Sequence, residues 1–131
     1  MRDLTNNIGE NAGRIWELIN EKGLINEEEI LKISKLNKNE FFAGIGWLAR
    51  ENKVSKENKN KYKLDNKTNL IIEIGETAGK VFKVMDIWGE VDIPILQKLV
   101  GVSEEEINSA LGWLAREGKI YINEKSRYNL K

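Results

Sequence analysis

A six-residue segment, Gly-Trp-Leu-Ala-Arg-Glu, occurs twice in the 131-residue chain, at residues 46–51 and 112–117. The alignment that places Gly46 on Gly112 also matches other positions without a gap: Ile8 with Ile74, Gly23 with Gly89 and Tyr62 with Tyr128. Self-similarity at one fixed period indicates a repeated structural unit. The sequence therefore predicts two similar domains, at residues 1–65 and 70–131. Because units of about 60 residues bury only about 60% of their unfolded surface, the two copies should pack on each other.

The charges are balanced both in the whole chain and within each repeat. Lysine plus arginine and aspartate plus glutamate number 21 each. Residues 1–66 carry 12 basic and 11 acidic side chains, and residues 67–131 carry 9 and 10. Neither half therefore has the excess of one sign that would attract a polyanion or a membrane surface over a long range.

Several classes of functional site are excluded by missing residue types. The chain has no histidine and no cysteine, so it lacks the commonest catalytic base, the thiolate nucleophile and the usual zinc ligands. Residues 75–80, Gly-Glu-Thr-Ala-Gly-Lys, are one residue short of a phosphate-binding loop, and Val81 replaces its Ser or Thr. We therefore expect no metal, no cofactor and no enzymatic activity.

No segment has the composition of a targeting or membrane-spanning sequence. Residues 1–7 lack the apolar core of a signal peptide, and no run approaches 18 apolar residues. The expected location is the cytoplasm, with no membrane association.

Each repeat begins with a predicted amphipathic helix. In the first repeat this helix covers residues 9–22, with a capping box formed by Asn7 and Glu10 and a left-handed terminator at Gly23. Its apolar residues recur at helical spacing: Ile8, Ala12, Ile15, Trp16 and Ile19. The second repeat shows the same pattern and stops at Gly89. A second, short helix follows in each repeat, capped by Asn26 and by Asp92.

The third helix of each repeat has the clearest signals, and a hairpin follows it. Capping boxes at Asn37 with Glu40 and at Ser103 with Glu106 open segments that run to Glu51 and Glu117. Residues 119–122 and 127–130 then alternate with period 2 around a polar turn, which predicts a two-stranded wing. In the first repeat the corresponding hairpin has a lysine-rich tip. The short connections at residues 24–25 and 90–91 leave room for a single strand bridge only. A linker at residues 65–69 spans about 17 Å at most, so the copies should be close neighbours.

The order of helix, short strand, helix, turn, helix and two-stranded wing is that of a winged helix-turn-helix domain. Two motifs carry a closer resemblance: Ile-Gly-Glu-x-Ala-Gly at residues 8–13 and 74–79, and the repeated hexapeptide. Together they resemble a family of small prokaryotic winged helix-turn-helix domains of unknown function, present here as two tandem copies. The resemblance implies a mostly α fold with a small β component, each domain having three helices plus a two-stranded wing. It also implies a DNA-binding type of fold, but no substrate, cofactor or binding residue.

In such a domain the third helix would enter the major groove of DNA. Rotation by 100° per residue places four residues on the expected outward face of each third helix: Asn39, Ala43, Gly46 and Arg50, and Glu105, Ser109, Gly112 and Arg116. The arginines lie near the C-terminal end, whereas base contacts usually come from the N-terminal part. Residues 104–106 are all glutamate, which has the wrong sign for phosphate. These carboxylates are better explained as stabilising the helix start by about 0.3–1 kcal/mol each.

The first repeat is better equipped to contact DNA. Its wing region contains five lysines and one glutamate, and Lys35 and Lys38 flank the start of its third helix. A basic wing could lie along a phosphate backbone, although a solvated lysine loop explains the same residues. The candidate nucleic-acid-binding residues are Lys35, Lys38, Asn39, Arg50, Lys56, Lys59, Lys61, Ser109, Arg116, Lys125 and Arg127.

Glycines on the expected outward face of the third helices are unusual, because glycine costs about 1 kcal/mol relative to alanine within a helix. Gly46 and Gly112 lie beside Trp47 and Trp113, which we predict to be interface residues. Small residues around an aromatic anchor suit the close approach of another chain segment. The favoured segment is the first helix, crossing through its second glycine at Gly13 and Gly79; the alternative is that the two copies meet there as a pseudo-dimer.

Two functions remain open. The first is a non-enzymatic, DNA-binding or transcription-associated tandem winged-helix protein with double-stranded DNA as its partner. The alternative is a protein–protein interaction module, whose wings or Trp faces bind another protein without any contact to DNA. The charge balance favours the interaction module, whereas the usual role of the fold favours DNA binding, and we place DNA binding first.

Overall fold

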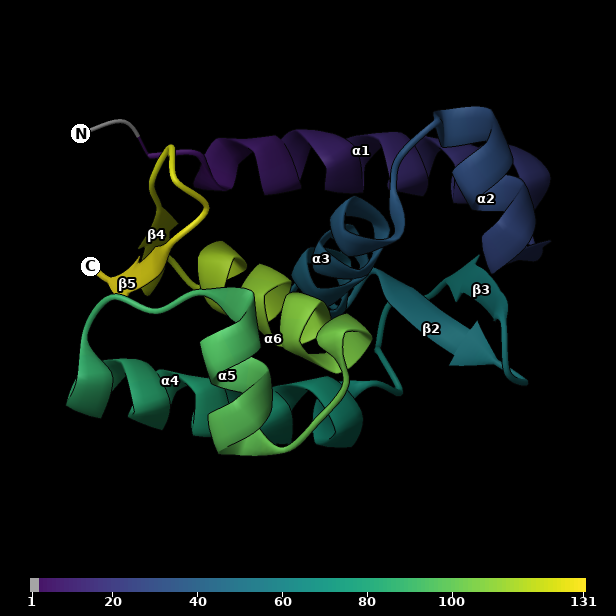
Figure 1. The fold of residues 1–131 in the computed structure, drawn as a ribbon. Coiled ribbons are helices and arrows are strands. Elements are labelled where there is room, and N and C mark those ends of the chain that lie inside the picture. Colours follow the sequence, from purple (N-terminus) through teal and green to yellow (C-terminus); the bar gives the residue numbers. More distant parts are fainter. Residues whose placement is uncertain (1–2) are drawn as a thin grey trace.

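A computed structural model describes residues 3–131 of the chain, and its fold is mostly helical with two small antiparallel sheets (Figure 1). The first repeat contains α1 (Thr5–Lys22), β1 (Ile25–Asn26), α2 (Glu27–Ser34), α3 (Lys38–Arg50), β2 (Val54–Glu57) and β3 (Lys61–Leu64). The second contains η1 (Ile71–Gly75), α4 (Glu76–Trp88), α5 (Ile93–Val100), α6 (Glu104–Arg116), β4 (Ile120–Ile122) and β5 (Tyr128–Leu130). Three helices and a two-stranded wing in each repeat confirm the predicted tandem winged-helix fold.

Local capping explains where the second and third helices begin. Asn26 accepts a hydrogen bond from the Glu29 N–H at the start of α2, and Asp92 does the same for Ile95 at the start of α5. Both predicted capping boxes at the third helices are complete. Each reciprocal pair of hydrogen bonds satisfies backbone donors that a helix start otherwise leaves free.

The predicted start of the first helix was wrong in both repeats. α1 begins at Thr5, before the expected start at residue 9, so Asn7 lies inside the helix and forms no capping box. In the second repeat a turn of π-helix, η1, precedes α4. The early start has a tertiary cause, because the added turns pack against the other repeat. The predicted end at Gly23 is confirmed, and its backbone has a positive φ of 82° that favours glycine.

The wings are antiparallel hairpins, as predicted. In the first wing (residues 54–64), β3 lies between β1 and β2, with Ile25 opposite Tyr62. In the second wing (residues 120–130), β4 pairs with β5, and a single bridge joins Val91 to Tyr128. The segment after the first helix therefore contributes a single bridge in the second repeat, as predicted, and a two-residue third strand in the first, where only a bridge was predicted.

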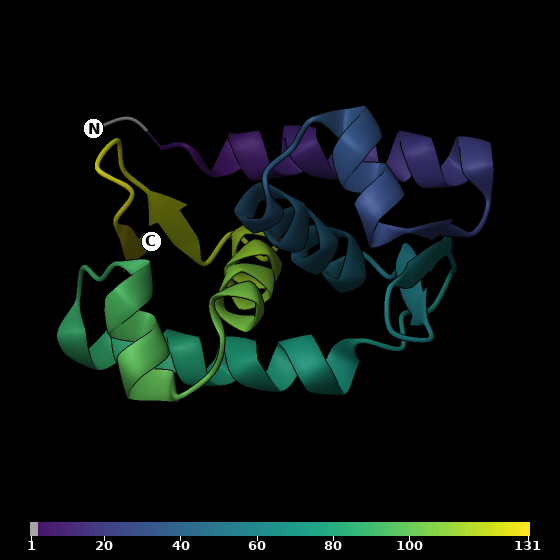
Figure 2. The ribbon, with the colours of Figure 1, turned by 45° about the vertical axis from the view of Figure 1, so that its right-hand side comes forward.

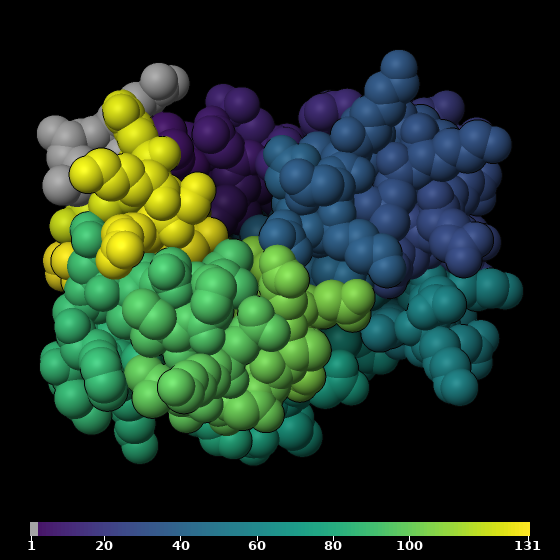
Figure 3. Space-filling view, in the orientation of Figure 1, coloured from purple at the N-terminus to yellow at the C-terminus, as the bar shows by residue number. Residues whose placement is uncertain are grey.

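The two repeats are arranged about the third helices. α3 and α6 lie side by side in the middle of the molecule, with α1 and α4 on opposite outer sides (Figures 1 and 2). The wings lie at opposite ends, and each is next to the start of the first helix of the other repeat (Figure 1). The space-filling view shows the second wing and the helices of both repeats forming one continuous surface (Figure 3).

Hydrogen bonds fix these contacts between a wing and the other repeat. The Leu4 N–H donates to the Ile122 carbonyl oxygen in the second wing at 2.9 Å. At the equivalent place in the first wing, the Lys56 N–H donates to Asn69 Oδ1 at 3.0 Å. The preceding linker is also bound to the first wing, because the Ser55 hydroxyl donates to Asp65 at 3.0 Å. That hydrogen bond lowers the pKa of the Asp65 carboxyl.

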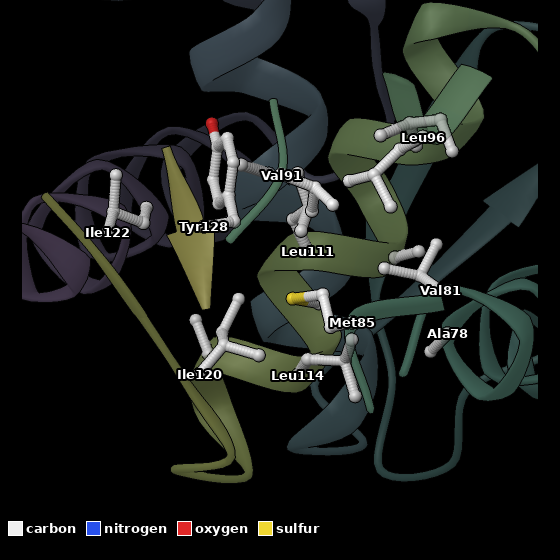
Figure 4. Close-up of a cluster of buried hydrophobic side chains, with 14 of the residues drawn as sticks. Ala78, Val81, Met85, Val91, Leu96, Leu111, Leu114, Ile120, Ile122 and Tyr128 are labelled. Carbon is white, nitrogen blue, oxygen red and sulfur yellow. The ribbon is translucent and has the colours of Figure 1, made fainter. Parts of the chain in front are cut away.

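The buried hydrophobic residues form two clusters, one centred on each repeat. The cluster of the second repeat contains Val81, Met85, Leu96, Leu111, Leu114 and Tyr128 (Figure 4). It also includes Ile8 and Ala43 from the first repeat. Conversely, Leu70 and Ile74 of the second repeat belong to the cluster of the first. Each repeat thus completes its core with residues from the start of the other repeat's first helix.

Because each core contains residues from the other repeat, truncating one such residue should destabilise the opposite repeat. Ile8→Ala should lower the free energy of unfolding by about 2–4 kcal/mol, because it opens a cavity in the core of the second repeat. Urea unfolding followed by tryptophan fluorescence measures the loss, and hydrogen exchange should show faster exchange in α6 and β4. Ile87→Ala is the control: that side chain is 79% exposed, so the change should stay within about 0.5 kcal/mol. If hydrogen exchange became faster only within α1, Ile8 would not be supporting the core of the second repeat.

Candidate nucleic-acid interface

The middle of the face of the third helices that was expected to point outward is buried between the two repeats, whereas Arg50, Glu105 and Arg116 at its ends are exposed. Along α3 and α6, Ala43, Gly46, Ser109 and Gly112 are all buried. A Cβ at Gly46 would lie 1.9 Å from the Ser109 carbonyl oxygen, and a Cβ at Gly112 would lie 1.8 Å from the carbonyl oxygen of Ala43. Only glycine allows two helix backbones to come this close. The two glycines of the repeated hexapeptide are therefore required by the contact between the repeats.

This geometry corrects the favoured prediction for these glycines. The first helices do not cross there through Gly13 and Gly79, since both of those positions face open space. The alternative, a pseudo-dimer of the two copies, is what forms. A different glycine of the first helix has the close contact: a Cβ at Gly9 would lie 2.9 Å from the Trp47 ring, and one at Gly75 would lie 3.3 Å from Trp113. Within each repeat the two sequence motifs are thus in contact: the glycine of the Ile-Gly-Glu-x-Ala-Gly motif packs against the tryptophan of the hexapeptide.

The remaining residues of the hexapeptide form a reciprocal set of contacts across the pseudo-dimer. Arg50 Nε donates to Glu117 at 3.0 Å, and its symmetry equivalent Arg116 donates to Glu51 at 2.8 Å. The Arg50 guanidinium lies 5.8 Å from the centre of the Trp113 ring, and Arg116 lies 5.9 Å from that of Trp47. Such partly exposed pairs contribute about 0–1 kcal/mol each, so they fix the register of the helices more than they hold them together.

The N-terminal ends of α3 and α6 are joined by polar contacts between unlike side chains. Asn39 donates to Glu104 at 2.8 Å, and Lys38 lies 3.9 Å from Glu105. These two contacts are equivalent in the alignment of the repeats, yet the first repeat supplies the cation and the amide while the second supplies both carboxylates. Two of the glutamates that were explained as helix-start residues therefore also pair with the other repeat.

Several predicted nucleic-acid-binding residues are engaged in this internal contact. Ser109 is only 7% exposed. Asn39, Arg50 and Arg116 are bonded to glutamates of the other repeat. Trp47 and Trp113, predicted as interface residues, are partly buried and each packs against the hydrophobic clusters of both repeats. The middle of the expected reading face is thus closed to solvent, while the side chains of Arg50 and Arg116 stay partly exposed at its end.

The other predicted residues lie on the surface, in separate groups. Lys59 occupies the turn of the first wing between Lys56 and Lys61, and both Lys59 and Lys61 are exposed. Lys63 of the same wing donates to Glu57 at 2.8 Å, which raises the pKa of the lysine. Lys35, at the end of α2, is exposed and has a positive φ of 61°.

At the opposite end of the molecule, the second wing carries Lys125 and Arg127. The Arg127 guanidinium lies 3.9 Å from Glu90, so part of its charge is compensated. The structure therefore does not join the cations of the two wings into one patch.

Sequence reasoning missed the role of the segments before the first helices. Asp3 and Asn69 are equivalent in the alignment of the repeats, and each accepts a hydrogen bond from a wing backbone N–H of the other repeat. The sequence signal that could have indicated this role is the equivalence of Asp3 and Asn69, which appears when the alignment of the repeats is extended to them.

A tandem winged helix-turn-helix architecture is thus defined by the elements and their order. The family described as "Winged helix-turn-helix domain (DUF2582)" matches the chain twice, over residues 1–65 and 64–130. Since the matches cover nearly the whole chain, the protein belongs to this family. A similar protein is "Uncharacterized protein MJ1608" of Methanocaldococcus jannaschii, 45% identical over 56 residues. That alignment covers 41% of this chain and 80% of the relative. No solved structure matches the chain.

Two other properties of residues 3–131 bear on function. None of their helices combines the length and the apolar character that crossing a membrane requires. In the same residues, acidic side chains form no group of three or more with an arrangement suited to a metal ion.

A pair of glycine substitutions tests the contact between the third helices. Gly46→Ala should lower the free energy of unfolding by about 1–3 kcal/mol, because the new Cβ meets a backbone oxygen that can move only if the helices separate. Gly13→Ala is the matched control: it faces open space within α1, so removing a helical glycine should stabilise by up to about 1 kcal/mol. Thermal and urea unfolding measure both. Equal effects of the two substitutions would contradict the close contact.

Proposed function

We propose that the protein is a non-enzymatic, cytoplasmic DNA-associated protein that contacts the phosphate backbone of double-stranded DNA through its first wing. Membership of the winged helix-turn-helix family supports the class of ligand. The observation that carries the proposed site is the exposed hairpin with Lys59 and Lys61 at its tip and Lys56 beside it. Hairpin lysines can follow a phosphate backbone without reading bases.

The proposed mode of binding follows from what the contact between the repeats leaves free. Major-groove reading needs the outward face of a third helix, and in this fold the middle of that face lies in the contact between the repeats. Lys35 and the first-wing lysines are the remaining candidates in the first repeat, with Lys125 and Arg127 as a separate group in the second; Lys38 already faces Glu105 across the contact. We therefore propose sequence-independent binding, dominated by the release of counterions from the phosphates.

Titration of a random-sequence DNA duplex at several salt concentrations tests the proposal. If the three wing lysines each neutralise one phosphate, log K should fall with log salt with a slope of about −3, and the affinity should lie in the micromolar range. Replacing Lys56, Lys59 and Lys61 together with glutamine should reduce binding to background. Fluorescence anisotropy of a labelled duplex measures both quantities.

The control removes the same charge elsewhere. Lys80, Lys83 and Lys98 are exposed lysines of α4 and α5, and their replacement by glutamine should leave the affinity within about twofold of the parent protein, since these lysines lie outside the wing. Equal losses in the two triple variants would show that net charge, and not the wing, determines binding. An unchanged affinity in the wing variant would place the DNA contact elsewhere.

The second candidate function is a protein-interaction module, and one observation favours it. Ile87 and Trp88, adjacent residues at the end of α4, are 79% and 62% exposed. Large apolar side chains exposed together are typical of surfaces that bind another protein. Absence of any duplex binding at low salt would favour this function over DNA association.

A further inference from the structure

Two related cavities lie where the repeats meet. The first, of about 290 Å³, is enclosed by α3, the first wing, η1 and the start of α6. The second, of about 250 Å³, is enclosed by α1, α3, α6 and the second wing. The alignment of the repeats relates their linings position by position; for example, Leu4 of the second cavity corresponds to Leu70 of the first. Each cavity is therefore built by both repeats.

The polar linings of the two cavities have diverged. Glu73 and Glu105 line the first cavity, and their equivalents in the second are Asn7 and Asn39. The first cavity thus has two carboxylates where the second has neutral amides. Since the surrounding fold is the same, this difference in charge is specific to the first cavity and is not required by the architecture.

The two carboxylates are available to a ligand. Glu73 forms no ion pair with any residue in the described part of the chain. Glu105 has only the long contact to Lys38 at 3.9 Å. A third acid, Glu106, is already occupied by the capping box of α6. Within residues 3–131 no group of three or more acidic side chains could hold a metal ion, so we consider an organic cation, whose ammonium group one or two carboxylates can bind.

The floor of the first cavity is apolar and partly aromatic. Phe42, Ile45, Leu70 and Ile74 line it, together with Tyr62. Aromatic rings beside carboxylates attract an ammonium group through both the ring face and the opposite charge. An apolar floor with a few convergent polar groups is also the usual composition of a small-molecule site.

Tyr62 adds a buried polar residue to the lining of this cavity. The residue is 1% exposed, and its hydroxyl forms no hydrogen bond with residues 3–131. No fully enclosed side-chain oxygen in this part of the chain lacks a partner, so the hydroxyl keeps some access to solvent, and Tyr62 is one of the residues that line the cavity. Burial raises the pKa of Tyr62, with smaller contributions from Glu27, Glu105 and Glu73. The neutral phenol is thus a free hydrogen-bonding group for a bound molecule.

We propose that the first cavity binds a small organic cation, an ammonium group attached to an aromatic or branched apolar body. Glu73 and Glu105 hold the ammonium, and the apolar body rests on Phe42 and Tyr62. Lys56, which also lines the cavity and whose Nζ lies 5.8 Å from the Tyr62 ring centre, opposes the ligand by charge repulsion. Because both repeats line the cavity, the ligand stabilises the packed arrangement of the two repeats. The inference does not rest on DNA binding.

Binding of phenethylammonium to the full-length protein tests this assignment, with 2-phenylethanol as the neutral molecule of the same shape. The ammonium compound should raise Tm in a concentration-dependent manner, and the alcohol should bind at least tenfold more weakly. In NMR spectra the shifts should appear at Phe42 and Tyr62. Equal binding of the two compounds, or shifts confined to the second cavity, would overturn the proposal.

Variants locate the site and separate it from general charge effects. Glu73→Gln combined with Glu105→Gln should weaken phenethylammonium binding at least tenfold; both side chains are exposed, so the fold should persist. Glu10→Gln combined with Glu21→Gln removes the same charge from exposed positions of α1 and should leave binding unchanged. Lys56→Gln should tighten binding, because it removes the competing cation. Parent-like affinity in the Glu73/Glu105 variant, or weaker binding in the Lys56 variant, would contradict the assigned roles.

Discussion

The close contact between α3 and α6 is the constraint on which the rest of the structure depends. Each hexapeptide glycine lies where any Cβ would overlap a backbone carbonyl oxygen of the opposite helix. Because the backbones are so close, the residues that follow are brought into reach of the other repeat. Arg50 and Arg116 then meet glutamates across the contact, and the two tryptophans lie beneath them. The repeated sequence is therefore best understood as a repeated interface.

That interface changes what a winged-helix fold can do. The surface that such domains use to read DNA is here the surface by which the two copies recognise each other. Ser109, which lies on that surface, is buried for this reason. The exposed features that remain are the wings, the apolar end of α4 and the cavities between the repeats. The functions proposed for this protein therefore use the wings and the cavities between the repeats, and not the buried contact between α3 and α6.

Several of the differences between the repeats are differences in charge. Asn39 and Lys38 face Glu104 and Glu105. If two second repeats were paired in the same way, glutamate would face glutamate, so the difference favours pairing of unlike copies. The same divergence places Glu73 in one cavity and Asn7 in the other. Duplication within one chain allows such asymmetry, because each position of a pair can change separately.

Much of the fold was predictable because it depends on short-range chemistry. The capping boxes at Asn37 and Ser103 and the left-handed glycine at Gly23 act within a few residues, so the sequence places them without tertiary information. The start of α1 was not predictable in this way. Its first turn is held by a hydrogen bond from Leu4 to Ile122 and by packing of Ile8 in the other core, and both contacts join segments that are far apart in the chain.

By itself, the sequence determined that this protein is a duplicated winged helix, with the helix caps, the wings and the shared motif in place. Only the tertiary structure decided which segment packs against Gly46 and Gly112. A glycine within a helix indicates that another segment comes close, but it does not identify that segment. The tertiary structure also decided that the two halves complete each other's cores and enclose the cavity with Glu73 and Glu105. The physical reason is that helix caps depend on adjacent residues, whereas interfaces depend on segments that are distant along the chain and meet only after folding.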